Sequence, residues 1–262
     1  MGRRFEGKVV VITGAGRGMG RTIADMFVDE GAKVVIAART ISYGEQTVAE
    51  IEARGGEALL CQTDVLSRTD IFRLIDQAVA RFGGIDVIVH CAAEVIYGSL
   101  LDISDEDIEK IFASNLKAAF WLTKAGAPHL SQARDGGRIV LISSICGTRT
   151  VVPGLVAYGA AKAGLNAFIA GAALELARDN ITVNGVEPGV TATDRMRSVT
   201  TDEQAREIAS TVPLGRIGES AEIGEAVLYL ASPRAGYATG RTITVDGGLS
   251  LSTTNLASET GG

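Results

Sequence analysis

The sequence predicts a doubly wound α/β fold, with helices on both faces of a parallel sheet. Short apolar segments alternate with patterns typical of amphipathic helices along most of the chain. A stretch with four glycines, residues 13–20, lies between the first such segment and the first helical pattern. The 262 residues are 46% hydrophobic, which is enough for a large core. Length and composition allow one large domain or two small ones. Of these we expect a single domain over residues 1–262, with a flexible polar tail at about residues 250–262.

The expected strands are short runs rich in β-branched and other apolar residues, and they lie at residues 8–13, 33–38, 57–62, 86–91, 138–143, 181–186 and 242–245. Runs without polar alternation are typical of strands that are buried on both faces of a parallel sheet. Helical patterns occupy most of the intervals, for example at residues 67–82 and 105–124. This alternation implies crossover connections between parallel strands.

The glycine-rich stretch reads Thr-Gly-Ala-Gly-Arg-Gly-Met-Gly from Thr13 to Gly20. Glycine allows a backbone to pass close to a ligand, and the free N–H groups of the following helix favour an anion. The usual anion there is the pyrophosphate of a dinucleotide, and the alternative is a turn that only packs the helix on the sheet. The loop differs from the phosphate-binding loop of NTPases, because Arg21 stands where the lysine would be.

The end of the second strand indicates which dinucleotide binds. About 20 residues after the glycine loop, an acidic residue normally accepts a hydrogen bond from the adenosine 2′-hydroxyl. Here the position is Ala38, followed by Arg39, and Arg17 lies in the loop. Guanidinium groups without a carboxylate suit a 2′-phosphate, which arginine binds through paired hydrogen bonds. We therefore expect NADP(H) to be preferred over NAD(H), the alternative being that both arginines are simply solvated.

Asp64 follows the third strand, where a carboxylate could accept a hydrogen bond from the adenine amino group. It could equally cap the helix that is expected to begin near Ser67 or Thr69. The local sequence leaves both interpretations open.

Tyr158 and Lys162 are spaced i, i+4 in an alanine-rich helical pattern, so that both side chains lie on one helix face. A free tyrosine has a pKa of about 10, and a neighbouring ammonium lowers that pKa. Such a pair alone also occurs on solvated helix surfaces. Ser144 ends the fifth strand, at the sheet edge where open α/β folds bind ligands. Together with Asn115, an unfavourable residue inside a long helical pattern, these residues form the candidate catalytic set.

Taken together, the motifs are similar to those of the short-chain dehydrogenase/reductase family, over about residues 5–249. The matching motifs are Thr13-Gly14…Gly18-Met19-Gly20, Asp64, Asn115, Ser144, Tyr158…Lys162, Asn184…Pro188-Gly189 and Asp246-Gly247-Gly248. Their joint order is highly specific. Through residues 7–8, 213–216 and 245–248, the chain most resembles the 3-oxoacyl-carrier-protein-reductase-like branch.

The resemblance implies a single-domain Rossmann fold with a seven-stranded sheet, and a homotetramer built by pairing the helices that contain Asn115 and Tyr158. Tyr158 would give its proton to the substrate oxygen, and Lys162 would lower the pKa of Tyr158 and hold the nicotinamide ribose. Ser144 would bond the substrate carbonyl, and Asn115 would hold a relay water in a bent helix turn. The cofactor would contact Gly14, Arg17, Gly18, Met19, Gly20, Arg39, Asp64, Val65, Cys91, Ala92, Tyr158, Lys162, Pro188, Gly189, Thr191 and Thr193.

One motif departs from the family pattern. Where the family usually shows Asn-Asn-Ala-Gly, this chain has His90-Cys91-Ala92-Ala93, which lacks the amide side chains that brace neighbouring strands. We interpret Cys91 as a packing residue. The substrate pocket is expected near residues 94–97, 147–155 and 193–212, and the last segment is expected to be a mobile lid. The polar contacts would be Tyr97 and Arg149, and the apolar lining would be Ile96, Val151, Val152, Leu155 and Met196.

Charge and composition argue against several classes of protein. A net charge of −6 argues against a nucleic-acid-binding surface, and two histidines are too few for a histidine-based zinc site, so no metal is expected. The three cysteines form no C-x-x-C pair, which fits a reducing compartment. No apolar run is long enough to span a bilayer, so we expect a cytoplasmic protein that does not bind membranes. A serine hydrolase is excluded by chain order, because both histidines precede Ser144.

The sequence thus predicts an oxidoreductase that transfers hydride between NADP(H) and a small-molecule carbonyl or secondary alcohol with an apolar part. The first interpretation is an NADPH-dependent ketone reductase. One alternative is an NAD(P)⁺-dependent alcohol dehydrogenase, which uses the same groups in reverse. The other is a dinucleotide-binding module without turnover.

Overall fold

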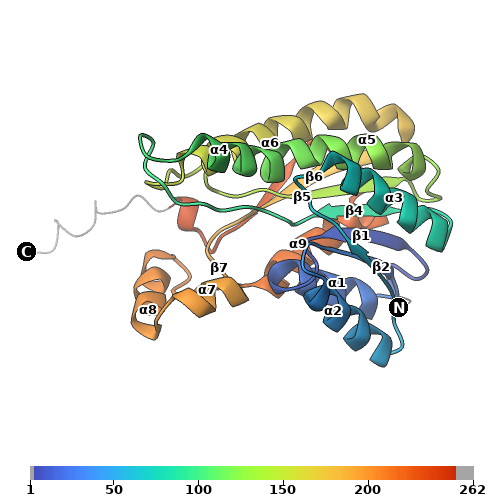
Figure 1. The fold of residues 1–262 in the computed structure, drawn as a ribbon, viewed down its shortest axis with the longest axis horizontal. Helices are drawn as coiled ribbons and strands as arrows, with labels where there is room; N and C mark the ends of the chain where they lie inside the picture. Colours follow the sequence, from blue (N-terminus) through green and yellow to red (C-terminus); the bar gives the residue numbers. More distant parts are fainter. Residues whose placement is uncertain (1–2, 252–262) are drawn as a thin grey trace, which may run out of the picture.

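The computed structural model describes residues 3–251, and its central sheet has seven parallel strands in the order β3-β2-β1-β4-β5-β6-β9 (Figure 1). The strands are β1 (Val9–Thr13), β2 (Lys33–Ala38), β3 (Glu57–Gln62), β4 (Val87–His90), β5 (Gly137–Ile142), β6 (Ile181–Pro188) and β9 (Thr242–Val245). The predicted fold class is confirmed. The expected strands at 33–38, 57–62 and 242–245 match the observed bounds, and the others differ by one or two residues at one or both ends.

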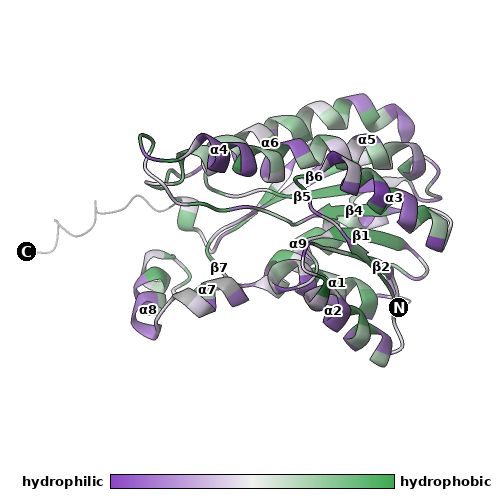
Figure 2. Ribbon diagram, in the orientation of Figure 1, coloured by the Kyte–Doolittle hydropathy of each residue, from purple (hydrophilic) through white to green (hydrophobic). Residues whose placement is uncertain are grey.

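Helices cover both faces of this sheet (Figure 1). One layer consists of α3 (Arg68–Phe82), α4 (Asp105–Phe112), α5 (Ala118–Leu130) and α6 (Val156–Leu176), and the other of α1 (Gly18–Asp29), α2 (Ile41–Ala53) and α9 (Ser220–Ala231). Because successive strand residues face opposite sides, Val11 and Ile88 pack in one apolar cluster, and Val10 and Ile12 in the other. Both faces are therefore apolar, as the hydropathy of the strands shows (Figure 2).

The long helical pattern expected at residues 105–124 is divided in three. Between α4 and α5 lies a π-helical turn, η1 (Ala113–Lys117), which contains Asn115. Such a turn shifts the hydrogen-bond register by one residue and is frequent at functional sites. The family resemblance implied a bent helix turn at Asn115, and the structure has a π-helical turn at this position.

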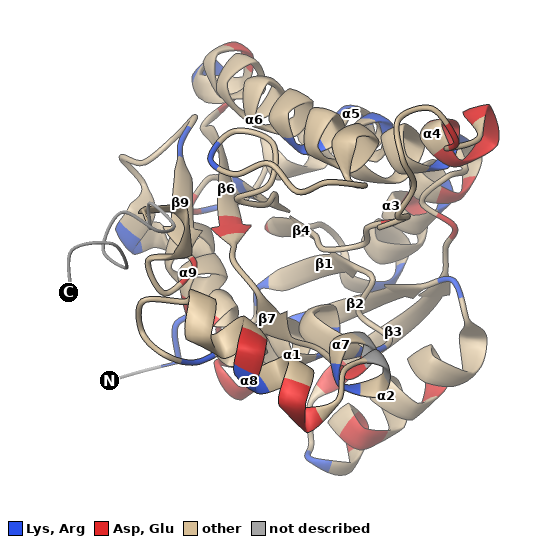
Figure 3. Ribbon diagram, turned by 90° about the vertical axis from the view of Figure 1, so that its left-hand side faces the viewer, with Lys and Arg blue, Asp and Glu red and all other residues tan. Residues whose placement is uncertain are grey.

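The segment after β6 leaves the main sheet. Strand β7 (Thr191–Ala192) pairs with β8 (Gly218–Glu219), and between them lie α7 (Asp194–Val199) and α8 (Asp202–Thr211) (Figures 1 and 3). The expected lid at residues 193–212 is therefore built mainly of two helices. Turns of 3₁₀ type complete the chain, at η2 (Ala177–Asp179), η3 (Pro233–Ala235) and η4 (Leu249–Leu251), and the expected tail lies, from residue 252 onward, outside the described residues.

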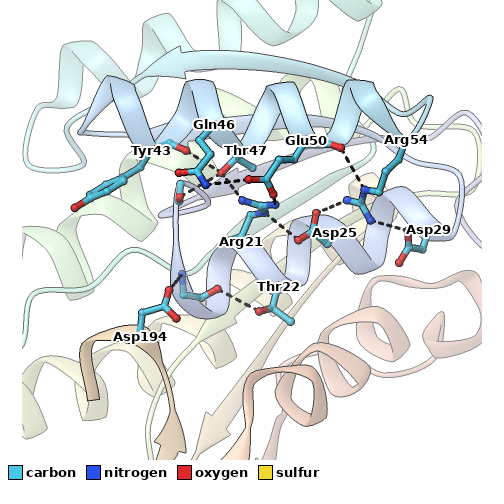
Figure 4. Close-up of polar contacts among 12 residues, drawn as sticks. Arg21, Thr22, Asp25, Asp29, Tyr43, Gln46, Thr47, Glu50, Arg54 and Asp194 are labelled. Atoms are coloured by element: carbon cyan, nitrogen blue, oxygen red, sulfur yellow. Dashed lines mark hydrogen bonds and ion pairs between the residues drawn. The ribbon is translucent and has the colours of Figure 1, made fainter. Parts of the chain in front are cut away.

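Ion pairs join α1 to α2 next to the glycine loop (Figure 4). Arg21 contacts Asp25 on its own helix and Glu50 on α2, and Arg54 of α2 reaches back to Asp25. Thr47 of α2 donates a hydrogen bond to the Gly16 carbonyl oxygen at 3.2 Å. A network of this kind fixes both helices better than an isolated surface pair does. Arg21 therefore has a structural role beside the loop.

Between residues 3 and 251, no helix combines the length and the apolar composition needed to cross a membrane.

Candidate active site

A cleft lies at the carboxyl ends of β1, β2 and β4. The chain runs from β1 outward to β3 and then returns to place β4 on the other side of β1, which makes this the switch point where open α/β sheets bind ligands. The residues expected at the cofactor that line this cleft are Gly14, Arg17, Gly18, Arg39, Asp64, Val65, Cys91, Ala92 and Thr193. The structure thus brings together the glycine loop and the loops that follow β2, β3 and β4.

Two glycines of the loop are required by the atoms around them. Gly14 has a φ of +73°, and a Cβ there would lie 2.9 Å from the backbone N and Cα of Ala92. A Cβ on Gly20 would lie 2.4 Å from the carbonyl oxygen of Gly14. The loop therefore fits tightly between the first turn of α1 and the loop after β4. Met19 belongs to that first turn and packs against the apolar cluster beneath it.

The N-terminal end of α1 holds an anionic oxygen. The Gly18 N–H donates a hydrogen bond to Asp194 Oδ2 at 3.1 Å, and Asp194 is the first residue of α7 (Figure 4). The first turn of a helix attracts negative charge, and the carboxylate shows that an anionic oxygen fits here. The residues present therefore fit the pyrophosphate of a dinucleotide.

Both arginines expected at a 2′-phosphate lie at this cleft, and both have partners. Arg39 Nη1 is 2.8 Å from Glu94 Oε1, and the Arg17 guanidinium carbon lies 5.1 Å from the centre of the Tyr43 ring. Neither guanidinium is therefore surrounded by solvent alone, although Arg39 remains 62% exposed. The preference for NADP(H) over NAD(H) stays a prediction. Glu94 was expected near the substrate pocket and not as a partner of Arg39, because no spacing rule connects two residues that are 55 positions apart.

The structure separates the two interpretations of Asp64. The N-cap of α3 is Ser67, whose hydroxyl accepts a hydrogen bond from the Asp70 N–H at 3.2 Å. Asp64 lies three residues before this cap and lines the cleft, while its Oδ1 accepts a hydrogen bond from the Leu66 N–H at 3.0 Å. Asp64 therefore does not cap the helix, and its carboxylate is placed beside the cleft.

Tyr158, Ser144 and Lys162 form a connected group. The Tyr158 hydroxyl is hydrogen-bonded to Ser144, and Ser144 Oγ accepts a hydrogen bond from the Cys146 N–H at 3.1 Å. Lys162 Nζ lies 5.7 Å from the centre of the Tyr158 ring and donates a hydrogen bond to the Ile142 carbonyl oxygen at 2.7 Å. Helix α6 thus presents the phenol and the amine to the end of β5.

The pKa values differ from the sequence-based expectation. Burial raises the pKa of Tyr158 to about 12, although the hydrogen bond from Ser144 acts in the opposite direction. Burial also lowers the pKa of Lys162 to about 8. Burial therefore outweighs the lowering of the Tyr158 pKa that was expected from Lys162, whose amine is directed at the Ile142 carbonyl oxygen. At neutral pH the phenol therefore keeps its proton and the amine is still mostly charged.

Asn115 is fully buried in the π-helical turn. Its Nδ2 donates hydrogen bonds to the carbonyl oxygens of Glu94 at 2.8 Å and Ile111 at 2.9 Å. Its Oδ1 has no hydrogen-bond partner within residues 3–251. A buried amide oxygen of this kind normally has a partner, and an ordered water is the usual one.

His90 supplies a brace that sequence reasoning missed. It is fully buried, and burial, together with the charge of Lys162, lowers its pKa to about 4, so the ring is neutral. Its Nε2 lies 2.9 Å from the Ser114 carbonyl oxygen and must donate there, so its Nδ1 accepts a hydrogen bond from the Thr13 hydroxyl at 2.7 Å. Although the family amides are absent, the imidazole therefore ties β1 and β4 to the turn that holds Asn115.

Burial raises the pKa of the Cys91 thiol, which follows His90, to about 12. The thiol is therefore neutral at physiological pH, in keeping with its interpretation as a packing residue.

The segment expected at the nicotinamide follows β6. A Cβ on Gly189 would lie 2.7 Å from the Asp246 Cα, and the Pro188 carbonyl oxygen accepts a hydrogen bond from the Ile145 N–H at 3.2 Å. The Thr191 hydroxyl donates to the Gly189 carbonyl oxygen at 3.2 Å, and Thr193 caps α7. These contacts fix the segment against the loop that contains Ser144.

Apolar side chains are exposed near Tyr158. Tyr97 is 69% exposed and Val151 is 85% exposed, and their two segments are joined by a hydrogen bond from the Gly98 N–H to the Gly154 carbonyl oxygen at 3.0 Å. Arg149, expected as a polar contact of the pocket, is instead ion-paired with the buried Glu187 of β6. The sequence could not indicate this pairing, because the two residues are 38 positions apart.

Comparisons with known proteins agree with this geometry. A family model described as Enoyl-(Acyl carrier protein) reductase matches residues 14–250. The chain is 35% identical over 256 residues to a probable tetrahydroxynaphthalene reductase of Zymoseptoria tritici, covering 93% of this chain and 95% of the relative. It is 40% identical over 248 residues to a 3-oxoacyl-[acyl-carrier-protein] reductase of Haemophilus influenzae, covering 95% and 100%.

Solved structures are similar over the same length. A 7α-hydroxysteroid dehydrogenase in complex with NADH and 7-oxo glycochenodeoxycholic acid has a TM-score of 0.88 at 32% identity, covering 94% of this chain and 95% of that one. A short-chain dehydrogenase/reductase from Serratia marcescens has a TM-score of 0.88 at 31% identity, covering 94% and 99%. The chain therefore belongs to the short-chain dehydrogenase/reductase family, on its 3-oxoacyl-carrier-protein-reductase-like branch. It is an oxidoreductase that acts on carbonyl or hydroxyl groups.

Proposed function

We propose that this chain is an NADPH-dependent reductase of ketones that carry an apolar part. The observation that carries the proposal is the hydrogen-bonded Tyr158–Ser144 pair, with Lys162 behind it, next to a cleft that Arg17 and Arg39 line. The nicotinamide, when bound, supplies the hydride. The relatives named above include reductases, which supports this direction.

In this proposal Tyr158 is the proton donor. Its raised pKa keeps the phenol protonated at neutral pH, and Ser144 positions the phenol through their hydrogen bond. The substrate carbonyl oxygen accepts hydrogen bonds from both hydroxyls, and it takes the proton of Tyr158 as negative charge develops on it. The charged Lys162 stabilises the phenolate that is left, and Asn115 Oδ1 holds a water that returns a proton.

The cofactor would lie along the cleft. Gly18 and its neighbours Gly14, Met19 and Gly20 would receive the pyrophosphate, while Asp64 and Val65 would contact the adenine. Cys91, Ala92 and Lys162 would contact the nicotinamide ribose, and Pro188, Gly189, Thr191 and Thr193 the nicotinamide. The preference for NADPH rests on Arg17 and Arg39, whose guanidinium groups suit a 2′-phosphate.

We propose a homotetramer in which the layer of α4, α5 and α6 pairs with its copy. Phe120 of α5 packs at a tilt against Phe168 of α6, with ring centres 4.4 Å apart, and Phe120 remains 45% exposed. An exposed aromatic side chain on a helical face is typical of a surface that a partner covers. Light scattering coupled to gel filtration tests this, because a monomer would contradict it.

The test of the proposed function uses a panel of apolar ketones, followed at the nicotinamide absorbance. We expect the wild type to consume NADPH, and Tyr158→Phe to lower kcat by about 10²- to 10⁴-fold while binding NADPH normally. Tyr237→Phe, at a fully exposed tyrosine, is the matched control and should retain full activity. Appreciable turnover by Tyr158→Phe would remove this residue from the proton-donor role.

A further inference from the structure

An acidic side chain faces the arginine that is proposed to bind the 2′-phosphate. Arg39 follows β2 and Glu94 follows β4, the two strands on either side of β1, and both residues line the cleft. Their ion pair, Arg39 Nη1 to Glu94 Oε1 at 2.8 Å, therefore spans the cleft above the end of β1. A cofactor bound with its adenosine ribose at Arg39 must meet this carboxylate.

The two partners differ in how firmly they are held. The Glu94 N–H donates a hydrogen bond to Ser114 Oγ at 3.0 Å, and its carbonyl oxygen accepts one from Asn115 Nδ2 at 2.8 Å. The Glu94 side chain is 26% exposed, whereas that of Arg39 is 62% exposed. The backbone of Glu94 is thus fixed to the π-helical turn, while the guanidinium of Arg39 is free to reorient. When a ligand binds Arg39, the backbone of Glu94 therefore stays in place and keeps its side chain at the cleft.

We infer that Glu94 is a selectivity residue, which limits the preference for NADPH by placing a negative charge beside the 2′-phosphate. A 2′-phosphate that binds Arg39 replaces the Glu94 carboxylate as the partner of the guanidinium, and leaves two anions close together. The 2′-hydroxyl of NADH carries no charge and brings no such repulsion. This inference rests on the proposed role of Arg39 in cofactor binding.

Asp194 offers an internal comparison, because its carboxylate would compete with the pyrophosphate, which NADPH and NADH share. Its carboxylate accepts the hydrogen bond of the Gly18 N–H, at the position that fits the pyrophosphate. Removing this charge should therefore tighten the binding of NADPH and NADH equally. Removing the charge of Glu94 should tighten the binding of NADPH alone.

The experiment measures the Kd of NADPH and NADH by fluorescence titration for the wild type, Glu94→Gln and Asp194→Asn. We expect Glu94→Gln to lower the Kd of NADPH about tenfold and that of NADH less than twofold, with the difference shrinking at high salt. Glu57→Gln is the matched control. Glu57 is also ion-paired, with Lys33 at 3.0 Å, but it is the first residue of β3 and so lies at the amino ends of the strands, away from the cleft. It should change neither Kd.

An unchanged ratio of the two Kd values in Glu94→Gln, or a ratio that moves toward NADH, would overturn the inference. Glu94→Ala gives a second reading of the same ratio, without an amide that could bond Arg39. If the wild type itself binds NADH more tightly, the proposed cofactor preference fails. The change in the ratio of the two Kd values from wild type to Glu94→Gln still decides the role of Glu94. A failure of the proposed cofactor preference is therefore distinguishable from a failure of the inference about Glu94.

Discussion

The imidazole of His90 makes the folded state sensitive to acid. The ring is neutral and buried, donating to the Ser114 carbonyl and accepting from Thr13, and its pKa is lowered to about 4 from 6.5. Because a folded-state pKa below the unfolded value means that the unfolded chain binds the proton first, the free energy of unfolding must fall as the pH drops from about 6.5 toward 4. Above pH 6.5 the contribution is fully present.

The size of this effect follows from the pKa difference. At about 1.4 kcal/mol per pH unit, His90 contributes about 3 kcal/mol at neutral pH, and this is lost by about pH 4. The variant His90→Asn carries the residue that is usual in the family and cannot titrate. Its absolute stability at pH 7 also reflects the altered hydrogen bonds, so the informative quantity is the slope of stability against pH.

The assay is denaturant unfolding at a series of pH values between 7 and 4, for the wild type and His90→Asn. We expect the wild type to lose about 3 kcal/mol more than the variant over this range. Equal slopes in the two proteins would refute the reasoning. An NMR titration that places the His90 pKa near 6.5 in the folded protein would refute it as well.

Three further predictions concern the cleft. In fluorescence titrations, Arg39→Asp should weaken NADPH binding at least tenfold more than NADH binding, because it puts a carboxylate against the 2′-phosphate. Equal losses for the two cofactors would contradict the phosphate contact. Gly14→Ala should destabilise the fold by about 1–2 kcal/mol and weaken the binding of both cofactors, because φ is +73° and the new methyl would collide with Ala92. Thermal unfolding measures the first effect, and cofactor titration measures the second. Proteolysis within residues 193–212 should slow when cofactor and substrate are present, and an unchanged rate would count against a lid.

The fold and the location of the candidate catalytic residues were predictable because they depend on local pattern. Buried strands read as apolar runs, and Tyr158 and Lys162 are one helical turn apart in the sequence. The resemblance to a known family supplied the roles that are proposed for Ser144 and Asn115. Predicting these features does not require knowing which residues that are distant in the sequence come into contact.

The remaining features depend on contacts between distant parts of the chain. His90 meets Thr13 across 77 positions, Glu94 meets Arg39 across 55, and Asp194 meets Gly18 across 176. No spacing rule connects such pairs. The direction of the Tyr158 pKa shift was wrongly predicted for a related reason. Burial, which decides both pKa values here, is a property of the fold and not of the i, i+4 spacing.

The central claim is that Tyr158 gives a proton to a carbonyl oxygen while the bound cofactor delivers hydride to its carbon. The most direct measurement uses NADPH deuterated at the transferred position, with mass spectrometry of the alcohol formed from an apolar ketone. The account predicts one deuterium on the carbinol carbon of the wild-type product, and almost no labelled product from Tyr158→Phe. An alcohol product without deuterium, or labelled product formed equally well by Tyr158→Phe, would contradict it.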